Sequence, residues 1–189
     1  MPYNPSGGYP NHLDIYSSLK QGFILTTASQ YGGPFYPDEN YITFSNGGTL
    51  SSVLKNGNGN LSMAAYDVTN AGEGTVTMYN YGNTHAVWII GSGKLTNVSS
   101  IVAANSLTVP SHVSKGLLVT SSAQYGGPFY PDQNAIAFSN GGQIDKKLLY
   151  IGNDGLTMTI YEVSNVGVGN ITCPAYGNTT YMWALFRFS

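Results

Sequence analysis

The sequence predicts an all-β protein built from two homologous β-sandwich or β-barrel units in tandem. A nine-residue string, QYGGPFYPD, occurs twice without a change, at residues 30–38 and 124–132. Apolar and polar residues alternate over short stretches, and glycine, asparagine and proline interrupt the chain about every 8 to 12 residues. A repeated string indicates duplication, and alternation between frequent turns is typical of strands in a sandwich or barrel.

The repeat extends well beyond the nine identical residues. The string FSNGG recurs at residues 44–48 and 138–142, and Trp88 falls on Trp183 when the chain is aligned with itself. We therefore expect four segments: an extended N-terminal arm that packs on a neighbour (residues 1–21), a first β repeat (22–95), a connector (96–115) and a second β repeat (116–189).

Alternation with a period of two places the strands in each repeat. Leu61 and Met63 share one face of a predicted strand, and residues 156–160 have the same pattern. A second strand contains Val76 and Met78, and the short runs before the two Asn-Gly-Gly turns are predicted strands as well.

The last predicted strand, residues 181–188, is apolar or aromatic at nearly every position. Such a strand is normally covered on both faces, by its own sheet partner and by another lobe or subunit. Helix signals are scarce. Residues 98–105 tolerate a helix but include the β-branched Ile101 and Val102, so a short helix and an extended segment both remain open there.

The composition excludes several classes of protein. The chain of 189 residues is long enough to bury its own core, and its single cysteine, Cys173, excludes an intrachain disulfide. Charged residues are 8% of the chain, the net charge is −2, and only Lys146 and Lys147 form a basic pair. We expect no nucleic-acid partner, because nucleic-acid binding needs clustered cations. We also expect no membrane span, because the apolar runs are too short.

The sequence also bears on where the protein works. A polar surface with few charges is typical of proteins outside the cytoplasm, yet the N-terminal residues have neither the basic start nor the apolar stretch of a secretory signal. Either a leader was removed before this numbering, or the protein reaches the outside by another route. Release by cell lysis, as for a virus particle, satisfies both observations. We therefore expect the protein on the surface of a virion.

The duplicated loop is the candidate binding surface. Its two glycines and two prolines exclude a central strand, and it carries three aromatic rings and one carboxylate. In one interpretation the rings plug the end of the β core and the aspartate caps a turn. In the other, the rings stack on sugars or fill a pocket of a partner. The candidate binding residues are Tyr31, Phe35, Tyr36 and Asp38 in the first copy and Tyr125, Phe129, Tyr130 and Asp132 in the second.

Patterns for catalysis and metal binding are weak. No nucleophile elbow, HExxH helix or P-loop occurs. Two carboxylates recur in the repeats, Asp38 with Asp67 and Asp132 with Glu162, which is the minimum for a glycosidase pair, although turn caps are the simpler explanation. The acidic and amide residues that begin at Asp38 and Asp132 have too few carboxylates for a tight calcium site. We therefore expect no enzyme activity, no catalytic residues, no bound metal and no cofactor.

Part of the first repeat resembles a known class of structural proteins. Its Gly-Asn turns and following segments at residues 58–63, 81–84, 91–95 and 99–103 are similar to those of the small β-rich head-decoration, or cement, proteins of tailed bacteriophages. The resemblance implies a structural, non-enzymatic role on a virion surface.

Two functions from different classes are therefore predicted. The first is a capsid decoration, cement or appendage component that binds capsid or other virion proteins and forms a homo-oligomer; a surface-layer or filament subunit follows the same logic with a different symmetry. The alternative is a carbohydrate-binding lectin, in which the two loop copies form equivalent glycan sites that gain avidity together.

Overall fold

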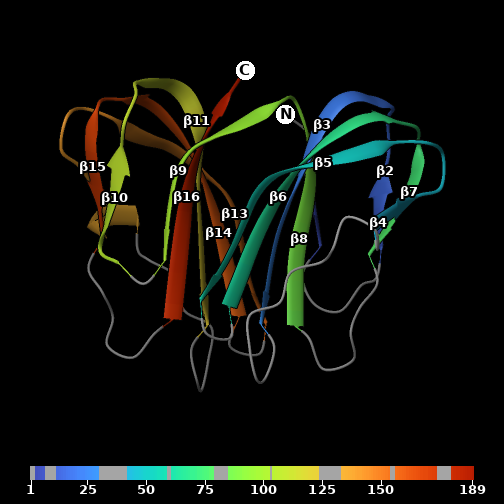
Figure 1. The fold of residues 1–189 in the computed structure, drawn as a ribbon, viewed down its shortest axis with the longest axis horizontal. Coiled ribbons are helices and arrows are strands. Elements are labelled where there is room, and N and C mark those ends of the chain that lie inside the picture. The colour runs from blue at the N-terminus through green and yellow to red at the C-terminus, as the bar shows by residue number, and fades with distance from the viewer. Residues whose placement is uncertain are drawn as a thin grey trace. The chain divides into compact units, whose positions relative to one another are not determined.

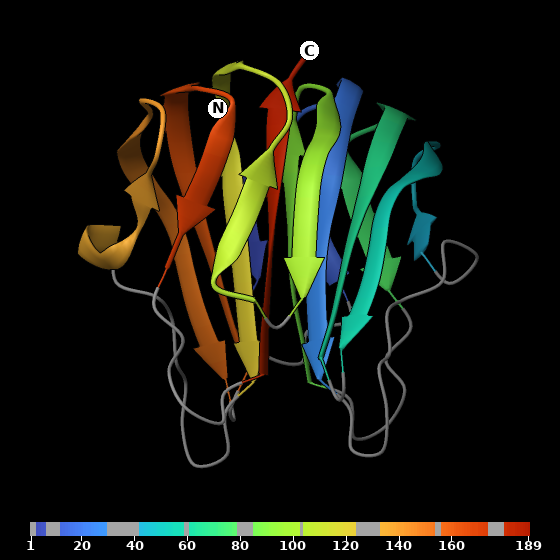
Figure 2. The ribbon, with the colours of Figure 1, turned by 60° about the vertical axis from the view of Figure 1, so that its left-hand side comes forward.

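The computed structural model describes residues 3–6, 12–29, 42–58, 61–78, 85–102, 104–123, 133–153, 156–173 and 180–189. In these ranges the chain forms strands and one 3-10 turn, η2 (Gln133–Ala135), drawn as a coiled ribbon in Figure 2. The predicted all-β class is confirmed. The chain divides into two compact units, unit 1 (Met1–Leu95, with Ser189) and unit 2 (Thr96–Phe188).

Unit 1 contains two antiparallel sheets (Figure 1). The five-stranded sheet has the order β1 (Tyr3–Ser6), β8 (His85–Ser92), β3 (Leu19–Ser29), β6 (Leu61–Ala71) and β5 (Thr49–Asn58). The three-stranded sheet has the order β2 (His12–Ile15), β7 (Gly74–Met78) and β4 (Ile42–Phe44).

Unit 2 has the same strand order, position by position, as unit 1. Its five-stranded sheet runs β9 (Leu95–Val102), β16 (Thr180–Phe188), β11 (Val113–Ala123), β14 (Leu156–Val166) and β13 (Gln143–Asn153). Its three-stranded sheet runs β10 (Ser106–Val109), β15 (Gly169–Thr172) and β12 (Ala137–Phe138).

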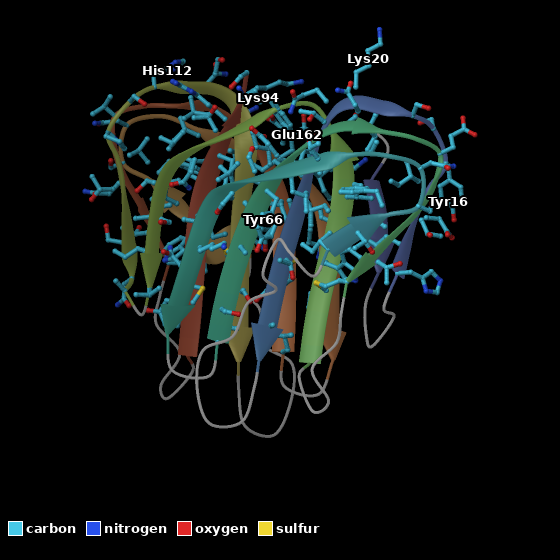
Figure 3. The ribbon with its side chains drawn as sticks, turned by 45° about the vertical axis from the view of Figure 1, so that its right-hand side comes forward. Tyr16, Lys20, Tyr66, Lys94, His112 and Glu162 are labelled. Atoms are coloured by element: carbon cyan, nitrogen blue, oxygen red, sulfur yellow. The ribbon has the colours of Figure 1, made fainter. Side chains whose placement is uncertain are left out.

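The core of unit 1 joins side chains from both of its sheets. Ile24 on β3 lies opposite Tyr66 on β6 and Ile90 on β8, so all three project from one face of the five-stranded sheet. They pack in one cluster with apolar residues of the three-stranded sheet, which include Leu13, Ile15, Ile42, Val76 and Met78. Tyr66 lies inside this unit, whereas Tyr16, at 77% exposure, points away from the ribbon (Figure 3). Burying each large apolar side chain contributes about 1.5–3 kcal/mol.

The core of unit 2 is built in the same way. Leu118, Tyr161 and Leu185 project from the five-stranded sheet into a cluster that includes Leu107 and Ile171 of the three-stranded sheet. Both faces of β16 are buried, as its apolar sequence predicts. Its residues Trp183 and Leu185 belong to this cluster, and Met182, Ala184 and Phe186, which alternate with them, are buried as well.

Strands also occur in the segments expected to form the arm and the connector. Residues of the expected arm form β1 and β2, and β2 adds Leu13 and Ile15 to the core at 3% and 6% exposure. Residues 96–115 contribute most of β9, all of β10 and the start of β11. Strand β9 includes residues 98–102, where a short helix had remained open. The β-branched Val98 and Ile101 both pack against the core of unit 2 from this strand.

Candidate functional site

All eight predicted binding residues lie outside the described residues. They are Tyr31, Phe35, Tyr36, Asp38, Tyr125, Phe129, Tyr130 and Asp132. The structure does place the strand ends to which both copies of the loop are attached.

The two loop copies are attached to equivalent strand ends. In unit 1, β3 ends at Ser29, opposite Leu61 at the start of β6 and His85 at the start of β8. In unit 2, β11 ends at Ala123, which pairs in the same way with the first residues of β14 and β16. The repeated loop therefore follows the same end of the middle strand of the five-stranded sheet in each unit.

Buried hydroxyl groups reinforce this end of each sheet. In unit 1, Thr27 Oγ1 donates a 2.8 Å hydrogen bond to the carbonyl oxygen of Ser62, and Ser62 Oγ donates to the carbonyl oxygen of Ala28 at 3.4 Å. In unit 2, Ser121 Oγ donates to the carbonyl oxygen of Thr157 at 3.0 Å. Each such bond contributes about 1 kcal/mol and joins the strand that precedes the loop to its neighbour in the sheet.

Unit 2 is more polar than unit 1 at this end of its core. Thr120 on β11 lies opposite Thr159 on β14, and both hydroxyl groups are buried without a hydrogen-bond partner. In the next cross-strand pair on the same face, Ser122 Oγ and Thr157 Oγ1 lie 2.5 Å apart. The sequence offered a signal for this difference, because alanine stands in the first repeat where the second has Thr159 and Ser122, but our sequence reading missed it.

Aromatic and sulfur side chains line the same end of unit 2. Tyr181 Oη donates a 2.7 Å hydrogen bond to Asn105 Oδ1, and Trp183 Nε1 donates to the carbonyl oxygen of Ala104 at 3.1 Å. Burial raises the pKa of the Cys173 thiol to about 11, and burial together with nearby Cys173 raises the pKa of Tyr181. The thiol is therefore protonated at neutral pH, which makes it a poor nucleophile and a poor metal ligand.

The second repeated string, FSNGG, forms the same turn in both units. In unit 1, Ser45 exchanges two hydrogen bonds with the backbone of Thr75, through its amide at 2.9 Å and its hydroxyl oxygen at 2.8 Å. Asn46 Nδ2 donates to the carbonyl oxygen of Glu73, and Gly48 has φ of 134° beside the Phe44 ring. Each of these residues therefore has a structural role in this turn.

Unit 2 repeats these contacts. Ser139 bonds to the backbone of Asn170 through its amide at 2.9 Å and its hydroxyl oxygen at 2.8 Å, and Asn140 Nδ2 donates to the carbonyl oxygen of Val168. In unit 1 the hydrogen bonds of this turn connect the end of β4 to the start of β7. The repeated loop precedes the other end of β4, where Ile42 pairs with Met78. FSNGG and QYGGPFYPD are therefore attached at opposite ends of each unit.

Of the two predicted carboxylate pairs, the described residues include one member each, Asp67 on β6 and Glu162 on β14. Glu162 forms an exposed ion pair with Lys115, whose Nζ lies 3.5 Å from Oε1. Such a pair at the surface contributes at most about 1 kcal/mol. Within the described part of the chain, no three histidine, cysteine, aspartate or glutamate side chains come together as a metal site.

Comparisons with known proteins add no family and no relative. No family model matches the chain, and neither a curated protein nor a solved structure matches it. In the part of the chain that the structure describes, no helix has the length and apolar character to cross a membrane.

Proposed function

We propose that this chain is a non-enzymatic structural protein of a virion surface, a capsid decoration, cement or appendage component that binds other structural subunits. We further propose that its two units are homologous β-sandwiches that arose by duplication. The shared strand order and the two repeated strings support the duplication. A core that joins side chains of both sheets in each unit supports the sandwich.

The observation that carries the proposal is the placement of the repeated loop. An identical string of nine residues is attached to the same strand ends in both units. The FSNGG string is explained by its turn contacts, whereas QYGGPFYPD lies outside the described residues. Two copies of one aromatic loop suit a partner that offers two copies of one site, because a second contact then forms at a high effective concentration. The lattice of a particle is such a partner.

The low charge also favours docking over chemistry. With charged residues at 8% of the chain, a contact surface has few ions to desolvate. Burial keeps the Cys173 thiol protonated, and the Glu162 carboxylate forms an ion pair with Lys115. These features support a binding role and give no support to catalysis.

Carbohydrate binding by a lectin with two equivalent sites is the second candidate. The observation that favours it is the combination, in both loop copies, of three aromatic rings with a carboxylate. Aromatic faces stack on sugar rings, and a carboxylate accepts hydrogen bonds from sugar hydroxyls.

Electron microscopy and mass spectrometry of particles purified from cells that produce the protein test the first candidate. We expect an antibody against the chain to decorate the particles, and the chain to be present at a fixed copy number per capsid subunit. A glycan array tests the second candidate. A sugar that binds the wild type and equally well the double variant Tyr36→Ala, Tyr130→Ala would remove the loop from the proposed site.

A further inference from the structure

Both FSNGG turns contain an asparagine followed by a glycine, a pair in which the asparagine side chain can react with the backbone. The pairs are Asn46-Gly47 in unit 1 and Asn140-Gly141 in unit 2, and all four residues are exposed to solvent. Glycine has no Cβ atom, so nothing shields its backbone nitrogen from Cγ of the preceding asparagine. The two turns therefore combine the sequence and the access to water that deamidation needs.

The reaction needs no reagent other than water. The backbone nitrogen of the glycine attacks Cγ of the asparagine and forms a five-membered succinimide ring. The bond from Cγ to Nδ2 breaks, and ammonia leaves with the proton of the glycine amide. Water then opens the ring at one of its two carbonyl groups and gives aspartate or isoaspartate, so that no oxidant or reductant is involved.

The turn of unit 1 restrains this reaction through two hydrogen bonds of the reacting residue. Asn46 Nδ2 donates to the carbonyl oxygen of Glu73, and the carbonyl oxygen of Asn46 accepts a 2.8 Å hydrogen bond from the backbone amide of Gly72. Ring closure turns Asn46 toward Gly47, so both bonds must open first. Such local opening is reversible, and it slows the reaction without abolishing it.

The turn of unit 2 holds its asparagine less firmly. Asn140 Nδ2 donates to the carbonyl oxygen of Val168, which is the counterpart of the bond in unit 1. The backbone amide of Gly167, however, donates to the carbonyl oxygen of Gly141 at 3.4 Å, and this distance is long for such a bond. Asn140 therefore has one hydrogen bond fewer to break than Asn46.

We propose that Asn140, and more slowly Asn46, deamidates spontaneously in the intact protein, and that the product releases the turn. The carboxylate that replaces the amide of Asn140 has no proton to donate to the carbonyl oxygen of Val168, so two acceptors face each other. Each event also adds one negative charge, so the first takes the net charge of the chain from −2 to −3. This modification is independent of the proposed function on a virion.

Storage of the full chain in a mildly alkaline buffer, with peptide mapping by mass spectrometry at intervals, tests the reaction. We expect aspartate and isoaspartate to form at Asn140 first and about tenfold more slowly at Asn46, a ratio that corresponds to 1.4 kcal/mol. Isoelectric focusing should show the acidic species at the same rate. The matched controls are Asn70 and Asn165, which are also exposed but precede alanine and valine, and both should stay unmodified.

The same chain in urea gives the rates without the turn, and there Asn46 and Asn140 should react equally fast. Absence of conversion at both residues of the folded protein would overturn the proposal, as would a faster reaction at Asn46 than at Asn140. Equal conversion at Asn70 or Asn165 would contradict the role of the following glycine. Asn140→Asp imitates one product and should unfold at a lower urea concentration than the wild type. Equal stability would contradict release of the turn.

Discussion

Gly48 and Gly142 illustrate how single residues fix the recurring turn. Their φ angles are 134° and 122°, a region that favours glycine. A Cβ atom at either position would lie 2.8 Å from the ring of Phe44 or Phe138. The backbone conformation and the close ring together explain why the Asn-Gly-Gly sequence is kept in both units.

Gly48→Ala and Gly142→Ala should therefore each destabilise the protein. We expect a loss of about 1–3 kcal/mol in the free energy of unfolding, from backbone strain and from displacement of the phenylalanine ring. Urea denaturation followed by circular dichroism measures it. Gly57→Ala is the matched control, because Gly57 is exposed on β5 and lies outside the positive-φ glycines. Equal stability of Gly48→Ala and the control would contradict this explanation.

The buried thiol gives a second prediction at this scale. Because burial raises the pKa of Cys173 to about 11 from 9.0, the unfolded chain loses this proton at lower pH than the folded protein. The contribution of Cys173 to stability is therefore constant below about pH 9 and falls as the pH rises from about 9 to 11. Denaturation at several pH values should show a smaller fall in Cys173→Ala than in the wild type. Tyr181, whose pKa is also raised, accounts for part of what remains.

Labelling tests the same burial directly. A thiol reagent at pH 8 should react with Cys173 slowly in the folded protein and rapidly in urea, since the reactive species is the thiolate. Equal rates in the two conditions would show that the thiol is accessible.

At the scale of the strands, buried threonine hydroxyls differ in whether they have a hydrogen-bond partner. The unpartnered hydroxyls of Thr120 and Thr159 oppose each other between β11 and β14, whereas the hydroxyl of Thr27 on β3 is bonded to a carbonyl of β6. A buried hydroxyl without a hydrogen-bond partner lowers the free energy of unfolding, and one with a partner raises it. The two kinds of threonine therefore respond in opposite directions to loss of the hydroxyl.

Thr159→Val should raise the free energy of unfolding by about 1 kcal/mol, because it removes an unpartnered hydroxyl at nearly constant volume. Thr27→Val should lower it by about 1 kcal/mol, because it removes a bonded one. Thermal and urea denaturation of both variants decide the matter. Destabilisation by Thr159→Val would mean that its hydroxyl has a partner in solution.

Strand placement could be read from the sequence where alternation was long and the turns were explicit. Strand β6 begins at the predicted Leu61, although both of its faces are buried from Leu61 to Tyr66, and both Asn-Gly-Gly strings are turns. Strands β2 and β10 could not be read in this way. Their four residues give only two apolar positions each, Leu13 with Ile15 and Leu107 with Val109, and the pairing with β7 and β15 that makes them strands is distant in the sequence.

At the scale of the whole molecule, the sequence predicted the all-β class but not how far each unit extends. The predicted first repeat begins at Gly22, whereas unit 1 includes β1 and β2, because pairing in a sheet depends on the alternation of apolar residues more than on their identity. The candidate site remains a prediction from sequence, since its eight residues lie outside the described ranges. The strand ends that carry it are equivalent in the two units.

The two loop copies give a prediction for the intact protein. If both contact the same particle, Tyr36→Ala and Tyr130→Ala should each weaken particle binding, and the double variant should lose far more than either one, because avidity depends on both contacts. Cosedimentation with purified particles measures the three affinities. A single variant that binds as well as the wild type would show that its copy of the loop does not contact the particle.

The most direct test of the central claim is the quantification of this chain by mass spectrometry in density-purified particles from the cells that produce it. The account predicts that the chain is present in a fixed ratio to the main capsid subunit and stays with the particle through repeated purification. Its absence from every particle fraction, together with its recovery as a free monomer, would contradict the account.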